Sequence, residues 1–422
     1  MKTIRVGICA LVAFSVVAFG GVEWWGVAAL EIGAAVLFLV WGMLVLRRRC
    51  ADLDWNWLYL PMLGVAVLVG AQRIFGLSAY PFATKVEIVK GVALLVLCFL
   101  ATSSYRTSAD RMSFAWFLAT LSFSFAIFGI AQQLAFDGKL YWLIPLPDGA
   151  EPFASFVNRD HYAGFVELTA PLALAMLCNV AHRKDKTALL VLFTIVPTLA
   201  LLLSGSRGGI LGFAVAILVI AILSRRALTT RRKLFGVLSL GILIGGLSLW
   251  LGSSSTLGRF APSPTVALTK SQRLAMDKDT WKIYLAHPWT GTGLGTLETV
   301  YPQFASFDDK RVVDHAHNDY LEFLAEAGTT GGLLGAGFIA VLLVAGIQNW
   351  RSAADADDRA FFAGGLAACE ALLVHSFADF NLHIPSNALL FLILATLACA
   401  KIPAHEPMRE RIKYSQGRAT TN

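Results

Sequence analysis

Charged residues are scarce in this chain. Only 15% of the 422 residues are Asp, Glu, Lys or Arg, whereas 56% are hydrophobic. An average soluble domain carries about 25% charged residues, so the composition excludes an ordinary soluble fold. Long apolar runs recur along the chain, and one membrane-spanning helix needs ~20 such residues. The sequence therefore predicts an all-α polytopic membrane protein.

Three further absences narrow the class of protein. Short segments of alternating polarity, which are typical of transmembrane β-barrels, do not occur. The six cysteines lie in or beside apolar runs, so we expect neither a disulfide nor a zinc site. The HExxH motif of many zinc proteases is missing, and TGTGLGT at 290–296 lacks the Lys-Ser/Thr pair of a nucleotide-binding loop. We interpret that glycine-rich stretch as a turn.

The apolar runs predict about twelve transmembrane helices in one integral membrane domain, residues 1–422. With the N-terminus placed in the cytoplasm, 22 of the 35 Lys and Arg residues fall on the inner side. Cytoplasmic loops carry such an excess, so we predict that both termini are cytoplasmic, including a tail at 402–422. This placement also accounts for the net charge of +7 without nucleic acid as a partner. The predicted spans are 6–22, 26–46, 57–72, 86–102, 112–134, 161–180, 187–204, 208–223, 234–251, 320–346, 360–378 and 385–401.

One predicted outer loop, residues 252–319, is too long for a simple connection. Its segment 271–288 predicts an amphipathic helix, with Trp281 and Leu285 on the apolar face and Arg273 on the opposite face. We therefore expect a large helical loop on the outer side of the membrane.

The stretch DHAHNDYLEFLAEAGTTGG, residues 314–332, sets many titratable groups beside an apolar run. Acids at a helix N-terminus offset the helix dipole, which suffices for Asp319 and Glu322. Glu326 lies deeper, where a charged group faces a protein or water-filled interior. Histidine is the only common side chain type that titrates near neutrality, so His317 is either a plain interfacial histidine or a general base.

The same stretch leaves a metal site open as a weak alternative. Asp314, His315, His317 and Asp319 alternate, and alternate residues of an extended segment share a face. Such a pattern of two histidines is not specific to metal binding. We expect no metal here.

Arg207 lies in SGSRGG between two apolar runs. The side chain either snorkels to the headgroups or binds an anion. Small neighbours allow a ligand to approach the backbone closely, and a guanidinium with free N–H groups suits a phosphate.

Two more polar groups fall on the predicted outer side. In VNRDH, Asn158 or Asp160 predicts a helix cap, which leaves Arg159 and His161 without a structural reason. In HSFADFNLHIP, the pair His375 and Asp379 at i and i+4 either interacts internally or lines the same cavity. An outward-facing cluster of arginines, histidines and carboxylates favours an enzyme with an anionic substrate.

Several motifs resemble those of the O-antigen ligase and O-antigen polymerase superfamily of bacterial inner-membrane glycosyltransferases. His317 and Asn318, nine residues, Gly328, two residues and Gly331 match its ligase motif in full. Arg207 in SGSRG and Arg273 ahead of HPWTGTGLG match two family arginines. FVNRDHYAGF and HSFADFNLHIP are similar to recurring family segments, although an aspartate replaces the more usual asparagine in the first.

The resemblance implies a fold and a reaction. The fold is GT-C-like and all-helical, in the bacterial inner membrane, with its active site at the periplasmic face. A glycan passes from an undecaprenyl diphosphate carrier to a hydroxyl acceptor such as lipid A–core, as in lipopolysaccharide biosynthesis, without a cofactor. The implied catalytic residues are His317, Arg207 and Arg273. The implied substrate-binding residues are Arg159, His161, Asn158, Asn318, His315 and Asp379.

Other functions remain open at the level of sequence. Within the superfamily, the chain is alternatively a polysaccharide repeat-unit polymerase or a protein O-oligosaccharyltransferase. A proton-coupled transporter is the alternative from another class. Transporters often carry two halves with matching broken helices, and this chain shows no such symmetry.

Overall fold

The computed structural model describes residues 1–48, 55–146, 150–180, 184–225, 264–307 and 312–401, and the described chain is mostly helical with very little strand. Six helices are long and apolar enough to cross a membrane. The predicted all-α polytopic membrane fold is therefore confirmed. A helix overlaps each predicted span within the described residues, whereas the span 234–251 and the tail 402–422 lie outside them. The helices are α1 Lys2–Val17, α2 Trp24–Arg48, α3 Tyr59–Ile74, α4 Pro81–Ser104, α5 Ser108–Leu134, α6 Arg159–Asn179, α7 Lys184–Ser204, α8 Arg207–Leu223, α11 Pro264–Ala286, α12 Leu297–Val300, α13 Asp319–Ser352, α14 Ala356–His375 and α15 Pro385–Cys399.

Short elements complete the described chain. The 3₁₀ turns are η1 Phe19–Gly21, η2 Tyr301–Gln303 and η3 Asn381–His383. Two antiparallel strands, β1 Lys139–Leu140 and β2 Ile144–Pro145, pair Lys139 with Pro145 and Leu140 with Ile144.

The centre of the bundle is made by α6, α14 and α15. Within the most apolar part of α6, 94% of the residues are buried, against 17% in α13 and in α2. A helix that is apolar or small on every side is suited to a buried position. Gly364 of α14 illustrates the fit, because a Cβ there would lie 2.9 Å from the Cα of Leu172 on α6. The outer helices α2, α3 and α13 carry exposed apolar side chains suited to contact with lipid.

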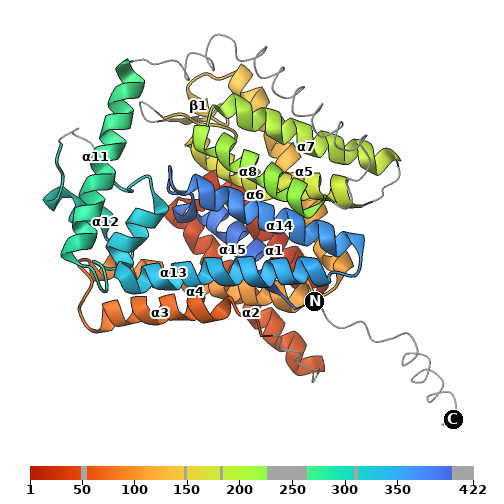
Figure 1. The fold of residues 1–422 in the computed structure, drawn as a ribbon, viewed down its shortest axis with the longest axis horizontal. Coiled ribbons are helices and arrows are strands. Elements are labelled where there is room, and N and C mark those ends of the chain that lie inside the picture. The colour runs from red at the N-terminus through yellow and green to blue at the C-terminus, as the bar shows by residue number, and fades with distance from the viewer. Residues whose placement is uncertain (49–54, 147–149, 181–183, 226–263, 308–311, 402–422) are drawn as a thin grey trace.

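Helix α11 crosses the direction of the bundle helices at one end of the molecule (Figure 1). The predicted helix at 271–288 is thus present, but its predicted apolar face was wrong. Trp281 and Leu285 are 44% and 58% exposed, whereas Met276 and Ile283 are buried. The buried face is set by packing against α12, η2 and α13, which the helical pattern of α11 alone does not specify.

The glycine-rich stretch 290–296 is a turn, as predicted, and it packs against a kink in α13. Gly328 has φ +64° and ψ −169°, so the helix is interrupted there. A Cβ at Gly328 would clash with the backbone of Trp289, so glycine is required for both conformation and space. Thr329 N donates to Pro288 O at 2.7 Å, and Gly293 N donates to Glu326 O at 3.0 Å.

The carboxylate of Glu326 is held by hydrogen bonds to the same turn. Its Oε2 accepts from Gly295 N at 2.9 Å and its Oε1 accepts from Leu297 N at 2.8 Å. The carboxylate therefore satisfies backbone donors of the turn and of the first residue of α12, which would otherwise be unpaired in the interior.

Candidate active site

His317 lies in the segment that precedes α13, at the end of the bundle near α11. Its φ of +52° is unusual for a residue with a side chain and costs of order 1–2 kcal/mol. The ring is 26% exposed, and its Nδ1 is 3.1 Å from Oδ1 of Asp379, which is only 1% exposed. The backbone is thus held in a strained conformation that brings the imidazole to a buried carboxylate.

Asp379 is held in its ionised form. Burial raises the pKa of this carboxyl, but the hydrogen bond with His317 and the electrostatic interactions with the nearby His161 and His375 rings outweigh burial and hold the pKa well below its ordinary value. An ionised carboxylate only accepts hydrogen bonds. Nδ1 of His317 therefore donates to Asp379, and Nε2 is the ring nitrogen left to accept a proton.

Phe380 is a residue of the site that the sequence reasoning missed. Its ring centroid lies 4.7 Å from that of His161, 4.4 Å from that of His315 and 5.0 Å from that of His317. A single aromatic ring therefore fixes three imidazoles contributed by two distant parts of the chain. Phe380 was missed because an apolar residue in an apolar chain carries no distinctive sequence signal; only its position beside Asp379 could have indicated a role.

Arg273 reaches the same turn from α11. Its Nη1 donates to the carbonyl oxygen of Ala378 at 3.2 Å, one residue before Asp379. Asp277, one helical turn further along α11, is a second residue that the sequence reasoning missed. Burial raises the pKa of Asp277, although Arg273, His317 and a hydrogen bond with Asn318 act in the opposite direction.

Arg207 is exposed as the first residue of α8, and the Ser206 side chain caps this helix by accepting from Gly209 N at 3.2 Å. The helix approaches its neighbours closely because of two glycines. A Cβ at Gly208 would clash with the ring of His375, and a Cβ at Gly212 would clash with the Glu167 carboxyl and lie 2.6 Å from the Ala371 carbonyl oxygen.

His375 links Arg207 to the rest of the site. Its Nδ1 lies 2.8 Å from Oε2 of Glu167, and both side chains are almost fully buried. It also lies close to Asp379, since His375, Asp379 and Asp160 each place one polar atom within 4.8 Å of the others. The predicted relation of His375 and Asp379 is thus proximity within one polar cluster, with Glu167 as the direct partner of His375.

The start of α6 contributes Asn158, Arg159 and His161. Asn158 is a helix cap, because its Oδ1 accepts from Asp160 N at 2.8 Å. Arg159 forms an ion pair with Glu151 through Nη2 at 2.8 Å, while its Nε and Nη1 are buried without a hydrogen-bond partner among the described residues. Nε2 of His161 is in the same condition. Buried donors of this kind are costly unless a ligand satisfies them.

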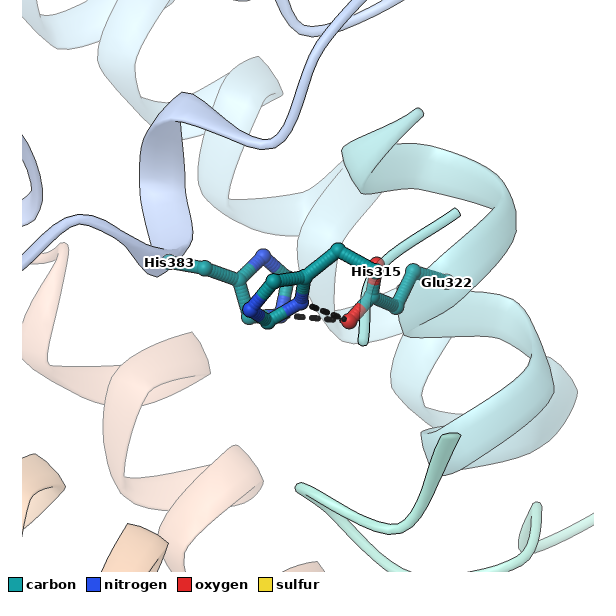
Figure 2. A group of neighbouring side chains, drawn as sticks. All are labelled: His315, Glu322 and His383. Carbon is teal, nitrogen blue, oxygen red and sulfur yellow. Dashed lines mark hydrogen bonds and ion pairs between the residues drawn. The ribbon is translucent and has the colours of Figure 1, made fainter. Parts of the chain in front are cut away.

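Asn318 and His315 flank His317 but differ in their partners. Asn318 caps α13, because its Oδ1 accepts from Leu321 N at 3.2 Å. Nδ1 of His315 lies 2.7 Å from Oε1 of Glu322, and Nε2 of His383 lies 3.2 Å from the same oxygen (Figure 2). Asp319 accepts from the Ser376 hydroxyl at 2.7 Å, so both acids have specific partners in addition to the helix dipole.

An apolar groove of about 760 Å³ runs between α3, α4, α13 and α15. Val92 and Leu333 line it and are 51% and 69% exposed, so the groove opens on the outer surface of the bundle. Asp319, Tyr320 and His383 also line it and form a polar part next to the start of α13.

These features define a polytopic helical membrane protein with a polar site at one end of its bundle and an apolar groove beside that site. Residues 189–336 match the model of the O-antigen ligase family. The matched region contains Arg207, Arg273 and His317, and it confirms the resemblance to the O-antigen ligase superfamily, whose members are ligase-like glycosyltransferases. A comparison with curated proteins finds no match.

Substitution of alanine for glycine is expected to change the stability of the protein in opposite directions at Gly212 of α8, which is closely packed, and at Gly337 of α13, which is not. Gly212→Ala is expected to destabilise the protein by about 1–3 kcal/mol, because its methyl group would clash with Glu167 and the Ala371 carbonyl. Gly337→Ala in α13 meets nothing within 4 Å and is expected to stabilise by about 0.5–1 kcal/mol. Unfolding midpoints of the purified variants in detergent measure both. Equal shifts in the same direction would contradict this packing.

Proposed function

We propose that this protein is an O-antigen ligase-type glycosyltransferase. It transfers a glycan from undecaprenyl diphosphate to a hydroxyl group, with lipid A–core as the acceptor. The observation that carries the proposal is the His317–Asp379 hydrogen bond with Arg273 at the adjoining carbonyl. A base oriented by a carboxylate beside a cation is the arrangement needed for attack by a hydroxyl on a substrate with an anionic leaving group.

His317 acts as the general base in this proposal. As the acceptor hydroxyl attacks the anomeric carbon, Nε2 of His317 takes its proton and the new glycosidic bond forms. The bond between the anomeric carbon and the diphosphate oxygen breaks, and its electron pair leaves with the carrier diphosphate. Asp379 orients the ring and stabilises the imidazolium that results. In-line displacement inverts the anomeric centre.

Arg207 and Arg273 stabilise the departing diphosphate. Negative charge develops on it as the bond between the anomeric carbon and the diphosphate oxygen breaks, and guanidinium groups bind phosphate oxygens through paired N–H donors. Arg159 offers two further buried donor nitrogens that have no partner among the described residues, and His161 offers one ring nitrogen. We assign substrate contacts to both residues. Asn158, Asn318 and His315 serve the site through the local structure they hold.

The apolar groove receives the polyprenyl chain of the donor. Its lining is almost entirely hydrocarbon, and it opens on the surface that faces lipid. Its polar part lies at Asp319, two residues after His317, so a chain in the groove would lead its diphosphate toward the site. This placement supports a lipid-linked substrate.

The positive-inside pattern supports a location in the bacterial inner membrane with both termini in the cytoplasm. The polar end of the bundle, with α11 and α12, then faces the periplasm, where the carrier presents its glycan. Repeat-unit polymerases and protein O-oligosaccharyltransferases would use the same step with another hydroxyl acceptor. Purified protein offered one lipid-linked donor with lipid A–core, free glycan and a serine-rich peptide in turn tests the choice of acceptor.

His317→Ala is expected to lower the transfer rate by roughly 10²–10⁴-fold, because a positioned general base contributes that much. Single-turnover transfer with a radiolabelled lipid-linked donor measures the rate. His287→Ala is the matched control, since His287 is exposed on the same loop. A His317→Ala protein that elutes and melts like wild type yet transfers at the wild-type rate would refute the base assignment.

Arg207→Lys is expected to lower the transfer rate by roughly 10²–10³-fold, the cost of removing one electrostatic group that acts on the transition state. Lysine keeps the charge but not the planar fork of donors. Lys278→Arg, on the exposed side of α11, controls for an exchange of the two cations. Full activity of Arg207→Lys would exclude paired contacts with the diphosphate.

The proposal that the groove binds the polyprenyl chain is tested by introducing tryptophan at each of two nearby glycines. Gly335→Trp places an indole in the groove, whereas Gly337 does not line it and has open space around it. Gly335→Trp is expected to raise KM for the polyprenyl donor at least about tenfold, since each ~1.4 kcal/mol of lost binding is a factor of ten. Gly337→Trp should leave KM within a factor of two. An unchanged KM in Gly335→Trp would place the lipid elsewhere.

A further inference from the structure

Two histidines and a glutamate meet where the chain re-enters the bundle. Nδ1 of His315 lies 2.7 Å and Nε2 of His383 lies 3.2 Å from the same oxygen, Oε1 of Glu322 (Figure 2). The three ligand atoms lie within 4.8 Å of one another. We propose that His315, Glu322 and His383 form a binding site for a divalent transition-metal ion of the zinc class.

The donor set selects the class of ion. Imidazole nitrogens and one carboxylate oxygen suit zinc and similar ions, whereas Ca²⁺ and Mg²⁺ prefer oxygen ligands. Zinc is bound at about 2.0–2.2 Å in tetrahedral sites, which separates ligand atoms by roughly 3–3.5 Å. The distances of 2.7 Å and 3.2 Å to Glu322 Oε1 therefore need a change of only a few tenths of an ångström. Water would complete the coordination.

The residues around these ligands hold them in the orientation that a metal needs. Nδ1 of His383, the nitrogen that faces away from Glu322, lies 2.9 Å from Oδ1 of Asp319. Asp319 is itself fixed, because its Oδ2 accepts from the Ser376 hydroxyl at 2.7 Å and from Leu382 N at 3.2 Å. A carboxylate that orients a histidine in this way is typical of zinc sites.

Glu322 is fixed in the same manner through its second oxygen. Oε2 accepts from Ala316 N at 2.8 Å, which leaves Oε1 directed at the two imidazoles. Asp319 and Glu322 are both buried, and buried carboxylates need positive charge or a metal ion close by. A dication between the imidazoles supplies that charge in place of protons on the rings.

The three ligands come from three separate segments. His315 belongs to the segment that precedes α13, Glu322 to the first turns of α13, and His383 to η3. An ion here would clamp these segments together beside His317, which follows His315 by two residues. Phe380 packs against both His315 and His317. The ion therefore stabilises the framework of the site and takes no part in bond making.

The test uses the full-length protein, purified without a histidine tag, stripped with a chelator and then titrated with Zn²⁺ alone. We expect one ion per chain by elemental analysis and a rise in the unfolding midpoint that Mg²⁺ does not reproduce. His315→Ala and His383→Ala are expected to weaken zinc binding at least tenfold. Asp319→Asn is expected to weaken it about 10–100-fold through the orientation of His383. His287→Ala, an exposed histidine of the same loop, should bind like wild type.

Titration with Co²⁺ gives a second readout on the unaltered chain. Intense visible absorption with one equivalent of Co²⁺ reports a tetrahedral site of nitrogen and oxygen ligands, and it does not depend on whether a variant folds. Less than one equivalent of zinc in the wild type would overturn the proposal. The proposal would also be overturned if both single variants, His315→Ala and His383→Ala, bound zinc with wild-type affinity. The cluster would then be an ion-pair network alone.

Discussion

Three carboxylates on the first turns of α13 are buried and must be given donors or positive charge. Asp319, Glu322 and Glu326 are 4%, 1% and 1% exposed, and an uncompensated buried carboxylate costs several kcal/mol. Each recruits a different segment. Asp319 holds the turn between α14 and α15, Glu322 holds the segment before α13, and Glu326 holds the glycine-rich turn. The segments that cover this end of the bundle are thus fixed by one helix.

This constraint explains how His317, the proposed general base, can be held in an unfavourable conformation. The segment before α13 is fastened at Ala316 by Glu322 and at Asn318 by the helix cap. His317 lies between these two points with φ +52°. Strained backbone persists where the surrounding contacts over-determine it. The result is an imidazole directed at Asp379, in place of one free to rotate in water.

Much of the fold could be predicted from the sequence because bilayer spans are local properties. Apolar runs of ~20 residues mark helices without knowledge of their partners, and the turn at 290–296 was predicted from its glycines. The features that could not be predicted depend on contacts with residues that are distant in the chain. The buried face of α11 is chosen by α12, η2 and α13, so Trp281 and Leu285 are exposed. Glu326 is explained only by the backbone of Gly295 and Leu297. Phe380 and Asp277 belong to the site through packing, which no spacing rule reports.

The turn between α14 and α15 is where these long-range requirements meet. Within nine residues, His375 supports α8 and its Arg207, Asp379 orients His317, Phe380 packs three imidazoles, and His383 meets Glu322. Arg207 on α8, Arg273 on α11 and His317 before α13 are therefore positioned against this one segment, as the proposed mechanism requires. Electrostatic stabilisation of a transition state requires groups that are already in place. Helices that slide within lipid would not guarantee this, whereas a short turn held by His375 with Glu167 and by His383 with Asp319 does.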